Sequence, residues 1–280
     1  VPSRLQPGEF YALPQSPQQY KQLLMVAGLE KYFQLARCLR DEDLRADRQF
    51  EFTQVDVEMS FATRDEIISQ MEEVVIEVIE KVGGKILQKP FPRLTYQEAM
   101  KKYGADKFDL RKNKKSEELA FAWVIDFPLF EKTETKTINP MHHPFTSPNP
   151  EDIPLLDKNP LKVRSWQYDL VCNGYEIGGG SIRVTDPELQ AKIFSILGHT
   201  KKEIKQKFGH LLKAFEYGAP PHGGVALGLG RILMLLAGEE NLREVVPFPV
   251  NSSGQTAVME APSTVDKDQL RELGITVVKK

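Results

Sequence analysis

The sequence predicts an α+β fold in which an antiparallel sheet is flanked by helices. Two segments, 31–59 and 166–184, each contain paired strand-like runs and predict β-hairpins. Apolar residues repeat at helical spacing in 65–82 and in the stretches that follow Asp186 and Thr200. We expect the functional site to lie on one face of this sheet.

Composition narrows the class of protein. A length of 280 residues allows one large domain or two modest ones, and such a chain buries about three quarters of its surface. The net charge of −2 excludes a globally basic nucleic-acid binder. Cys38 and Cys172 lack metal-ligand spacing and predict core thiols of a reducing compartment. Without an apolar run of membrane-span length or a signal-peptide pattern, we expect a soluble, cytoplasmic protein.

The first hairpin carries a two-faced strand and a long charged loop. One face of 51–59 is apolar or small: Thr53, Val55, Val57 and Met59. The other holds an aromatic ring, an amide and two carboxylates: Phe52, Gln54, Asp56 and Glu58. We expect the first face in the core. The loop of about ten residues exceeds the two to five usual for hairpins, which favours a functional loop, although a solvated charged loop is the alternative.

Before this hairpin, Ser16-Pro17 predicts a helix start, with serine as N-cap and proline at the first helical position. The expected inward stripe is Tyr20, Leu23, Leu24 and Ala27. Gln18 and Lys21 lie one turn apart and off that stripe. The residues alone therefore favour a surface lysine on an exposed helix face.

The segments after the hairpin are predicted to be scaffold and loop. Thr95 with Glu98 forms a capping box that opens a short helix, and 107–130 passes from a charged linker into an apolar strand. The proline-rich loop region 131–162 contains the adjacent pair His142 and His143. Adjacent side chains rarely converge on one metal ion, so structural loop histidines are the simpler interpretation.

The second hairpin is set by the Asn-Gly dipeptide at 173–174, which indicates a type I′ turn. A two-residue loop there pairs Asp169 with Gly178, which makes Asp169 and Glu176 diagonal neighbours with backbones about 7–8 Å apart. Two such acids repel each other unless a cation lies between them, and Mg²⁺ takes one or two carboxylates plus phosphate oxygens. The alternative is a pair of solvent-facing acids on an edge strand.

Two further features follow that turn. Three glycines at 178–180 in mid-strand are costly unless something approaches the backbone closely. Arg183 lies on the same face as Ser181, and its planar fork suits a carboxylate. The run GVALGLGR at 224–231 predicts a strand leading into an apolar helix.

Five segments in one order resemble class II aminoacyl-tRNA synthetases, in the form found in bacterial-type aspartyl-tRNA synthetases. They are QSPQQYKQ at 15–22, RDEDLRADRQFEFTQVDVE at 40–58, MHHPF at 141–145, NGYEIGGGSIR at 173–183 and GVALGLGR at 224–231. The resemblance implies a class II catalytic core over 1–280, without the anticodon-binding barrel, motif 1 and the inserted domain expected near 111–120. It implies ATP-dependent activation of aspartate and transfer to the 3′ end of tRNA, with ATP, Mg²⁺ and a homodimer.

The resemblance also assigns roles to residues. The ATP-binding set would be Arg40, Glu42, Arg48, Phe52, Glu176, Gly179 and Arg231, with Arg40 and Arg231 acting on the phosphates as catalytic groups. The aspartate-binding set would be Ser16, Gln18, Lys21, Gln54, Asp56, His142, His143 and Arg183. Asp169 and Glu176 would bind the metal, and Arg45 and Arg48 would contact the tRNA acceptor end.

Two residues near these positions differ from the family pattern. Gly230 replaces an aspartate usual before Arg231, and Phe50 replaces a proline common in the long loop. Two other functions stay open: an asparaginyl-tRNA synthetase or asparagine-synthesising relative, and a non-catalytic tRNA-binding paralogue. Joint retention of six assigned residues argues against the non-catalytic alternative: Arg40, Phe52, Asp169, Glu176, Arg183 and Arg231.

Overall fold

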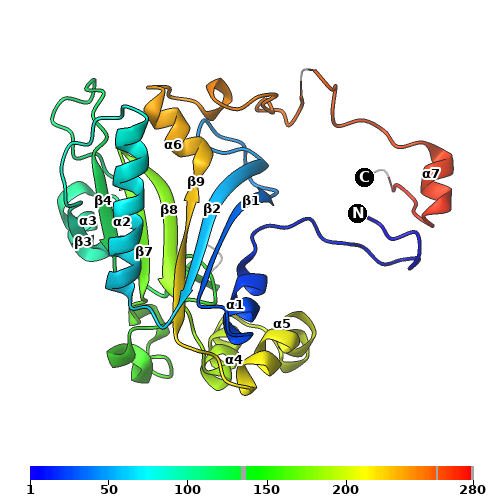
Figure 1. The fold of residues 1–280 in the computed structure, drawn as a ribbon. Coiled ribbons are helices and arrows are strands. Elements are labelled where there is room, and N and C mark those ends of the chain that lie inside the picture. The colour runs from blue at the N-terminus through cyan, green and yellow to red at the C-terminus, as the bar shows by residue number, and fades with distance from the viewer. Residues whose placement is uncertain (134–136, 257, 279–280) are drawn as a thin grey trace.

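The computed structural model describes residues 1–133, 137–256 and 258–278. Within them, the main sheet has seven strands in the order β1-β2-β9-β8-β7-β4-β3, and only the β3–β4 pair is parallel (Figure 1). The strands are β1 Lys31–Leu39, β2 Glu51–Ser60, β3 Arg93–Thr95, β4 Phe121–Ile125, β7 Gln167–Cys172, β8 Tyr175–Ile182 and β9 His222–Gly228. A separate small hairpin is formed by β5 Phe130–Lys132 and β6 Ile138–Pro140. The predicted antiparallel sheet is confirmed.

Helices cover both faces of this sheet. They are α1 Gln18–Val26, α2 Arg64–Lys81, α3 Tyr96–Tyr103, α4 Pro187–Ile196, α5 Lys201–Glu216, α6 Leu229–Leu236 and α7 Lys267–Glu272. Short 3₁₀ turns lie at Pro150–Leu155, Pro160–Lys162 and Leu242–Glu244. Helix α2 packs on one face, and α1 lies on the other with α4 and α5 below it (Figure 1). Capping boxes open α2, α3 and α5, which confirms the box predicted at Thr95.

Alternation along β2 separates an apolar face, which packs in the core, from a polar face on the other side of the sheet. Val55, Val57 and Met59 join the main hydrophobic cluster under α2. Asp56 and Glu58 are 1% and 0% exposed on the opposite face. Burying two carboxylates requires compensating charges nearby, so this face holds the polar groups of the fold.

The predicted orientation of α1 is wrong. Pro17 rather than Ser16 is the N-cap residue, and the Ser16 hydroxyl accepts from the Gln18 amide at 3.4 Å. Tyr20 of the expected inward stripe is 73% exposed, whereas Lys21 is 1% exposed. The helix packs its Lys21 side on the polar face of β2, while Leu23 and Val26 pack against the hydrophobic cluster of α4 and α5.

The predicted register of the second hairpin holds next to the turn and is wrong by one residue beyond it. A β-bulge between Leu170 and Val171 pairs Asp169 with Gly179 instead of Gly178. The extra residue, Ile177, turns into the main core. Glu176 pairs with Val171 on the turn side of the bulge, so Asp169 and Glu176 still share the face opposite α2.

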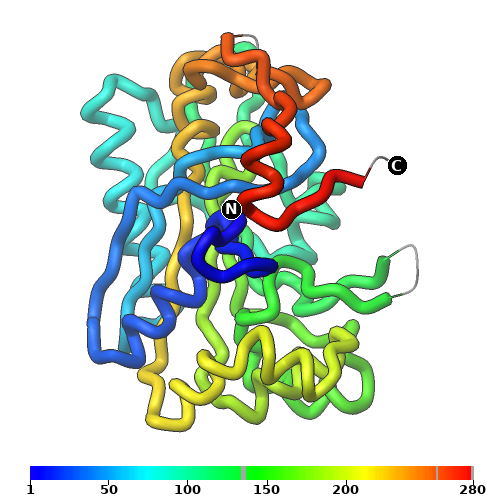
Figure 2. Tube along the Cα trace, turned by 90° about the vertical axis from the view of Figure 1, so that its right-hand side faces the viewer, coloured from blue at the N-terminus to red at the C-terminus, as the bar shows by residue number. Residues whose placement is uncertain are grey.

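Both chain ends of the described structure lie on the side of the sheet away from α2 (Figures 1 and 2). There Arg4 contacts Glu272 of α7 at 3.3 Å. Among the described residues, no helix has the length and apolarity needed to cross a membrane.

Candidate functional site

Four charged side chains form a buried cluster on the sheet face opposite α2, and we call Lys21, Asp56, Glu58 and Arg183 the charge cluster. The Lys21 ammonium lies 2.7 Å from Asp56 Oδ1 and 3.0 Å from Glu58 Oε2. Arg183 donates to Glu58 through Nε at 2.8 Å and Nη2 at 3.0 Å. None of the four side chains is more than 2% exposed. Two cations thus balance two carboxylates out of contact with water.

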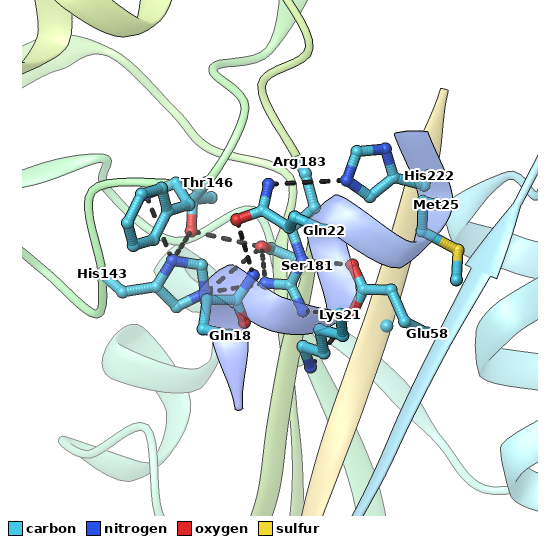
Figure 3. Close-up of polar contacts among 12 residues, drawn as sticks. Gln18, Lys21, Gln22, Met25, Glu58, His143, Thr146, Ser181, Arg183 and His222 are labelled. Carbon is cyan, nitrogen blue, oxygen red and sulfur yellow. Dashed lines mark hydrogen bonds and ion pairs between the residues drawn. The ribbon is translucent and has the colours of Figure 1, made fainter. Parts of the chain in front are cut away.

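Three elements bring these charges together, and Figure 3 shows Lys21, Glu58 and Arg183 among them. Lys21 comes from α1, the two acids from alternate positions of β2, and Arg183 follows the last residue of β8. A side chain at Gly224 of β9 would overlap the Glu58 carboxylate and the Val57 carbonyl. The glycine leaves the space in which Glu58 lies.

The remaining nitrogen of Arg183 faces a histidine and a serine. Its Nη1 donates to Ser181 Oγ at 2.7 Å and to His143 Nε2 at 2.8 Å (Figure 3). Burial, together with the neighbouring Arg183 guanidinium, holds the pKa of His143 well below its ordinary value. His143 is therefore neutral, and its Nε2 accepts from Arg183 in the shorter of two contacts, since the Phe145 amide lies 3.3 Å from its Nδ1. This is the one edge of the guanidinium that is not engaged by a carboxylate.

The two acids of the charge cluster respond differently to burial. Burial raises the pKa of Asp56, and Lys21 lowers it without offsetting the effect. For Glu58 burial also acts upward, but Arg183 and Lys21 outweigh it and bring the pKa to about 2. The difference follows from the number of direct cation partners, one for Asp56 and two for Glu58.

Amides and a second histidine surround the charge cluster. Gln18 Nε2 donates to Gln22 Oε1 at 3.0 Å, and Gln22 Nε2 lies 3.4 Å from His222 Nε2 (Figure 3). His222 Nδ1 donates to the Pro220 carbonyl at 2.8 Å, which leaves its Nε2 as the acceptor. Burial lowers the pKa of His222, in keeping with a neutral ring. The surroundings thus place neutral donors and acceptors around the four charged groups.

Asp169 and Glu176, which we call the carboxylate pair, lie on β7 and β8. Asp169 Oδ2 is 2.8 Å from His142 Nε2, and its Oδ1 accepts from Gln167 Nε2 at 2.7 Å. Glu176 Oε2 is 2.9 Å from the Lys107 ammonium. Burial, with Glu176 adding to it, raises the pKa of Asp169 although His142 opposes the change. For Glu176 the upward effect of burial is outweighed by Lys107, which lowers the pKa.

The carboxylate pair fits an ion that uses few protein ligands. No group of three or more His, Cys, Asp or Glu side chains in the described part of the chain is arranged to hold a metal. Magnesium commonly binds through one or two carboxylates and completes its shell with water and phosphate oxygens. The pair meets that requirement, and a side chain at Gly179 would lie 2.7 Å from Asp169 Oδ1 in the same space.

The neighbouring glycines, Gly178 and Gly180, closely approach the adjacent strand β9. A side chain at Gly178 would overlap Leu227 of β9, and one at Gly180 would overlap the Gly224 carbonyl. The close approach that requires glycine at these two positions is therefore that of β9. Only Gly179, whose missing side chain leaves room for a functional carboxylate, keeps a direct relation to the site.

The predicted nucleotide residues of the first hairpin lie together. The Arg40 guanidinium is 5.0 Å from the centre of the Phe52 ring, a cation–π distance. Glu42 lies 3.8 Å from Arg40 Nη1 and 3.3 Å from Arg48 Nη1. These contacts place a planar ring, two arginines and one acid at the mouth of the loop.

Arg231 joins that loop to the carboxylate pair. It donates through Nη1 to the Glu176 carbonyl at 2.6 Å and through Nε to the Asp47 carbonyl at 3.2 Å. Its Nη2 is 3.0 Å from Asp47 Oδ2. A side chain at Gly230 would lie 3.0 Å from Leu242 Cδ2, so the glycine at this position fits tight packing against the 3₁₀ turn.

Several predicted residues take other positions. His142 contacts the carboxylate pair and not the charge cluster, and Gln54 accepts from the Cys38 thiol at 3.5 Å. Arg45 is exposed on the loop. Ser16 bonds only the start of α1 among the hydrogen bonds of the described residues.

Sequence reasoning omitted some residues that the structure brings into contact with the site. They are Gln22, Asp47, Glu58, Lys107, Gln167, Ser181 and His222. Alternation along β2 already put Glu58 on the face of Asp56, and that pattern was the available signal. Alternation likewise puts Gln167 on the face of Asp169, two positions along β7. For Lys107 the sequence held no signal, because its contact with Glu176 depends on the packing of separate segments.

Comparisons with known proteins show which family the chain matches. A family model described as tRNA synthetases class II (D, K and N) matches residues 1–252. The chain is 40% identical to an aspartate–tRNA(Asp/Asn) ligase of Syntrophomonas wolfei, covering 100% of this chain and 69% of the relative. A second aspartate–tRNA(Asp/Asn) ligase, from Rubrobacter xylanophilus, is also 40% identical, with 99% and 67% covered.

Solved structures give the same fold. An aspartyl-tRNA synthetase from Entamoeba histolytica has a TM-score of 0.67 at 24% identity and covers 84% of this chain and 51% of its own. The asparaginyl-tRNA synthetase of that organism, in complex with asparaginyl-adenylate, has a TM-score of 0.64 at 23% identity, covering 84% and 56%. The chain thus spans about half the length of these two structures. From the family model and the 40% identical relatives, the chain belongs to the class II tRNA synthetases of the D, K and N group.

Proposed function

We propose that the chain is the catalytic core of an aspartate–tRNA ligase, which forms aspartyl-adenylate from aspartate and ATP and transfers the aspartyl group to the 3′ end of tRNA. The observation that carries the proposal is the charge cluster, which lies on the same sheet face as the carboxylate pair. Curated relatives that are 40% identical bear the name of this activity.

In this proposal, the catalytic core lacks the inserted domain. The alignment to the Syntrophomonas wolfei relative runs over 405 positions, more than the 280 residues of the chain. The relative therefore contains stretches without a counterpart here. This supports the absence of an inserted domain near 111–120, where the chain runs only from α3 to β4.

Aspartate would bind at the free edge of Arg183. Glu58 occupies the Nε and Nη2 edge, so a substrate carboxylate would bind Nη1 in place of its contacts with Ser181 and His143. Asp56, with a single cation partner, would bind the substrate ammonium. Asparagine has nearly the same shape, but its amide cannot replace a carboxylate beside these cations.

Adenylate formation would depend on positioning. The substrate α-carboxylate is already ionised at neutral pH and needs no general base. Its oxygen attacks the α-phosphorus, and pyrophosphate leaves. Phe52 would stack on adenine, Arg40 would hold the α-phosphate and Arg231 the γ-phosphate, so the protein orients the reactants and offsets negative charge.

A magnesium ion would be held by Asp169 and Glu176. When bound, it would neutralise the β- and γ-phosphates. His142 and Gln167 fix the Asp169 carboxylate on one side of that position, and Arg231 fixes the backbone of Glu176 on the other.

The long loop would contact tRNA. Exposed Arg45 and half-buried Arg48 on the long loop would contact the acceptor end of tRNA.

The edge strand β1 exposes Phe33 and Leu35 by 77% and 65%, which supports a homodimer that covers this strand. A cytoplasmic location fits the free, buried thiols of Cys38 and Cys172.

The test is pyrophosphate exchange into ATP with each amino acid in turn. We expect exchange with aspartate and a preference over asparagine of about a hundredfold to a few thousandfold, from the cost of leaving a buried charge unpaired. Equal exchange with asparagine would overturn the substrate assignment. Absence of exchange with every amino acid would favour a non-catalytic tRNA-binding protein.

A further inference from the structure

Lys107 reaches the site from a segment outside the five recognised motifs. It lies between α3 and β4, next to Phe108, which is 4% exposed and stacks on Tyr103 at 4.3 Å. The Phe108 carbonyl accepts from the Gly174 amide of the β7–β8 turn at 3.0 Å. The backbone at Lys107 is thereby fixed to the hairpin that carries Glu176.

The side chain of Lys107 ends on the Glu176 carboxylate. The ion pair measures 2.9 Å, and the two side chains are 39% and 27% exposed. On the other side of Glu176, Arg231 Nη1 donates to its backbone carbonyl at 2.6 Å. Two cations therefore flank one residue of the carboxylate pair, and only Arg231 has an assigned role toward phosphate.

A metal ion and Lys107 compete for the same carboxylate. Magnesium binds an oxygen at about 2.0–2.1 Å, and an ammonium within hydrogen-bond distance of that oxygen would be repelled at close range. Lysine is a compact charge on a flexible stem, and Lys107 is partly exposed, so its ammonium is free to move. The nearest new anion would be the polyphosphate that the metal and Arg231 hold.

We propose that Lys107 is a phosphate-binding residue that rests on Glu176 in the nucleotide-free protein and moves to the β- and γ-phosphates when metal and nucleotide bind. This inference rests on the proposed function. In the reaction, an oxygen of the substrate carboxylate bonds to the α-phosphorus while the bond from that phosphorus to the bridging oxygen breaks. Pyrophosphate keeps the electron pair of the broken bond, and Lys107 stabilises the negative charge it gains.

Two measurements on Lys107→Met test the proposal. The KM for pyrophosphate, in ATP synthesis from the adenylate, should rise about tenfold to a hundredfold, the range for one charged hydrogen bond. The KM for aspartate should stay as in the unmodified protein. Mn²⁺ binding to the nucleotide-free protein, followed by electron paramagnetic resonance, should become tighter because the competing ammonium is gone.

Two control variants separate this role from a structural one. Lys107→Arg keeps the positive charge and should restore most of the pyrophosphate affinity. Lys101→Met, at an exposed position of α3, should leave both measurements unchanged. An unchanged pyrophosphate KM in Lys107→Met, or unchanged Mn²⁺ binding, overturns the inference. If the unmodified protein shows no aspartate-dependent pyrophosphate exchange, the proposed function is overturned instead.

Discussion

Glu58 binds Arg183 through two of the three guanidinium nitrogens, at 2.8 and 3.0 Å, and both side chains are out of contact with water. The same carboxylate lies 3.0 Å from the Lys21 ammonium. Glu58 therefore sets the orientation of Arg183 and directs its Nη1 edge toward His143. It is a positioning residue for the proposed aspartate site, and it also connects β2 to the end of β8.

The first prediction is that Arg183→Met destabilises the fold as well as the site. Removing one partner of a buried ion pair leaves the other charge uncompensated, at a cost of about 3–5 kcal/mol. Urea denaturation should show this loss in the free energy of unfolding. The double variant Arg183→Met with Glu58→Gln should recover part of it, because the glutamine side chain carries no charge. A single variant as stable as the unmodified protein would contradict the pairing.

The second prediction concerns stability at acid pH. The pKa of Glu58 is about 2 in the folded protein against an ordinary value of 4.5, so folding favours its ionised form. Its contribution, about 3 kcal/mol, should be complete above pH 4.5 and should be lost as the pH falls from 4.5 toward 2. Asp56, with a raised pKa, acts in the opposite direction. Unfolding free energies of the unmodified protein and Glu58→Gln across this range isolate the Glu58 part, and parallel curves would refute it.

The sequence predicted the strands better than it predicted the charged partners. Period-two alternation in β2 identified both faces because the apolar face packs under α2. The same reasoning failed for α1, because a helix that packs on buried carboxylates turns its lysine toward them. Burial of Lys21 could be inferred only with Asp56 and Glu58 in place.

Long-range pairing and local irregularity also limit what can be read from sequence. Arg183 and Glu58 are 125 positions apart, and only the sheet order β2-β9-β8 brings them together. The bulge beside Val171 changed the register of the second hairpin although the Asn-Gly turn was predicted correctly. Turn chemistry fixes the first pairs of a hairpin, whereas a bulge depends on packing farther along.

The third prediction is that activation depends on magnesium through Glu176. Glu176→Gln should reduce aspartate-dependent pyrophosphate exchange by about 10²-fold, the cost of one lost transition-state contact. The backbone carbonyl that binds Arg231 is unchanged by this substitution, so Arg231 should keep its place. Exchange is measured against magnesium concentration and in excess chelator. Full activity in chelator would contradict the metal assignment.

The fourth prediction separates tRNA contact from adenylate formation. Arg45 is exposed and its charge is directed to solvent, whereas Arg48 is paired with Glu42 at 3.3 Å. Arg45→Glu should therefore reduce aminoacylation while leaving pyrophosphate exchange unchanged. Arg48→Glu should reduce both, because it places a second acid beside Glu42 and Arg40. Aminoacylation at the unmodified level in Arg45→Glu would remove the loop from the tRNA-binding surface.

The fifth prediction follows from the contact between Asp47 and Arg231. The Asp47 carboxylate lies 3.0 Å from Nη2 of Arg231, the residue proposed to bind the γ-phosphate, and the two side chains are 28% and 21% exposed. ATP must displace this carboxylate before Arg231 can bind phosphate. A partly exposed ion pair contributes about 0–1 kcal/mol, so Asp47→Asn should lower the KM for ATP by up to about fivefold.

The control for Asp47→Asn is Asp43→Asn. Asp43 is an exposed acid of the same loop, and its substitution should leave the KM for ATP unchanged. The loop itself should stay in place in Asp47→Asn, because the backbone carbonyl of Ala46 accepts from the Leu242 amide at 2.8 Å independently of the side chain. ATP binding is measured by calorimetry and by the KM in pyrophosphate exchange. A higher KM in Asp47→Asn would mean that the carboxylate holds Arg231 in its binding position, and that phosphate does not compete with it.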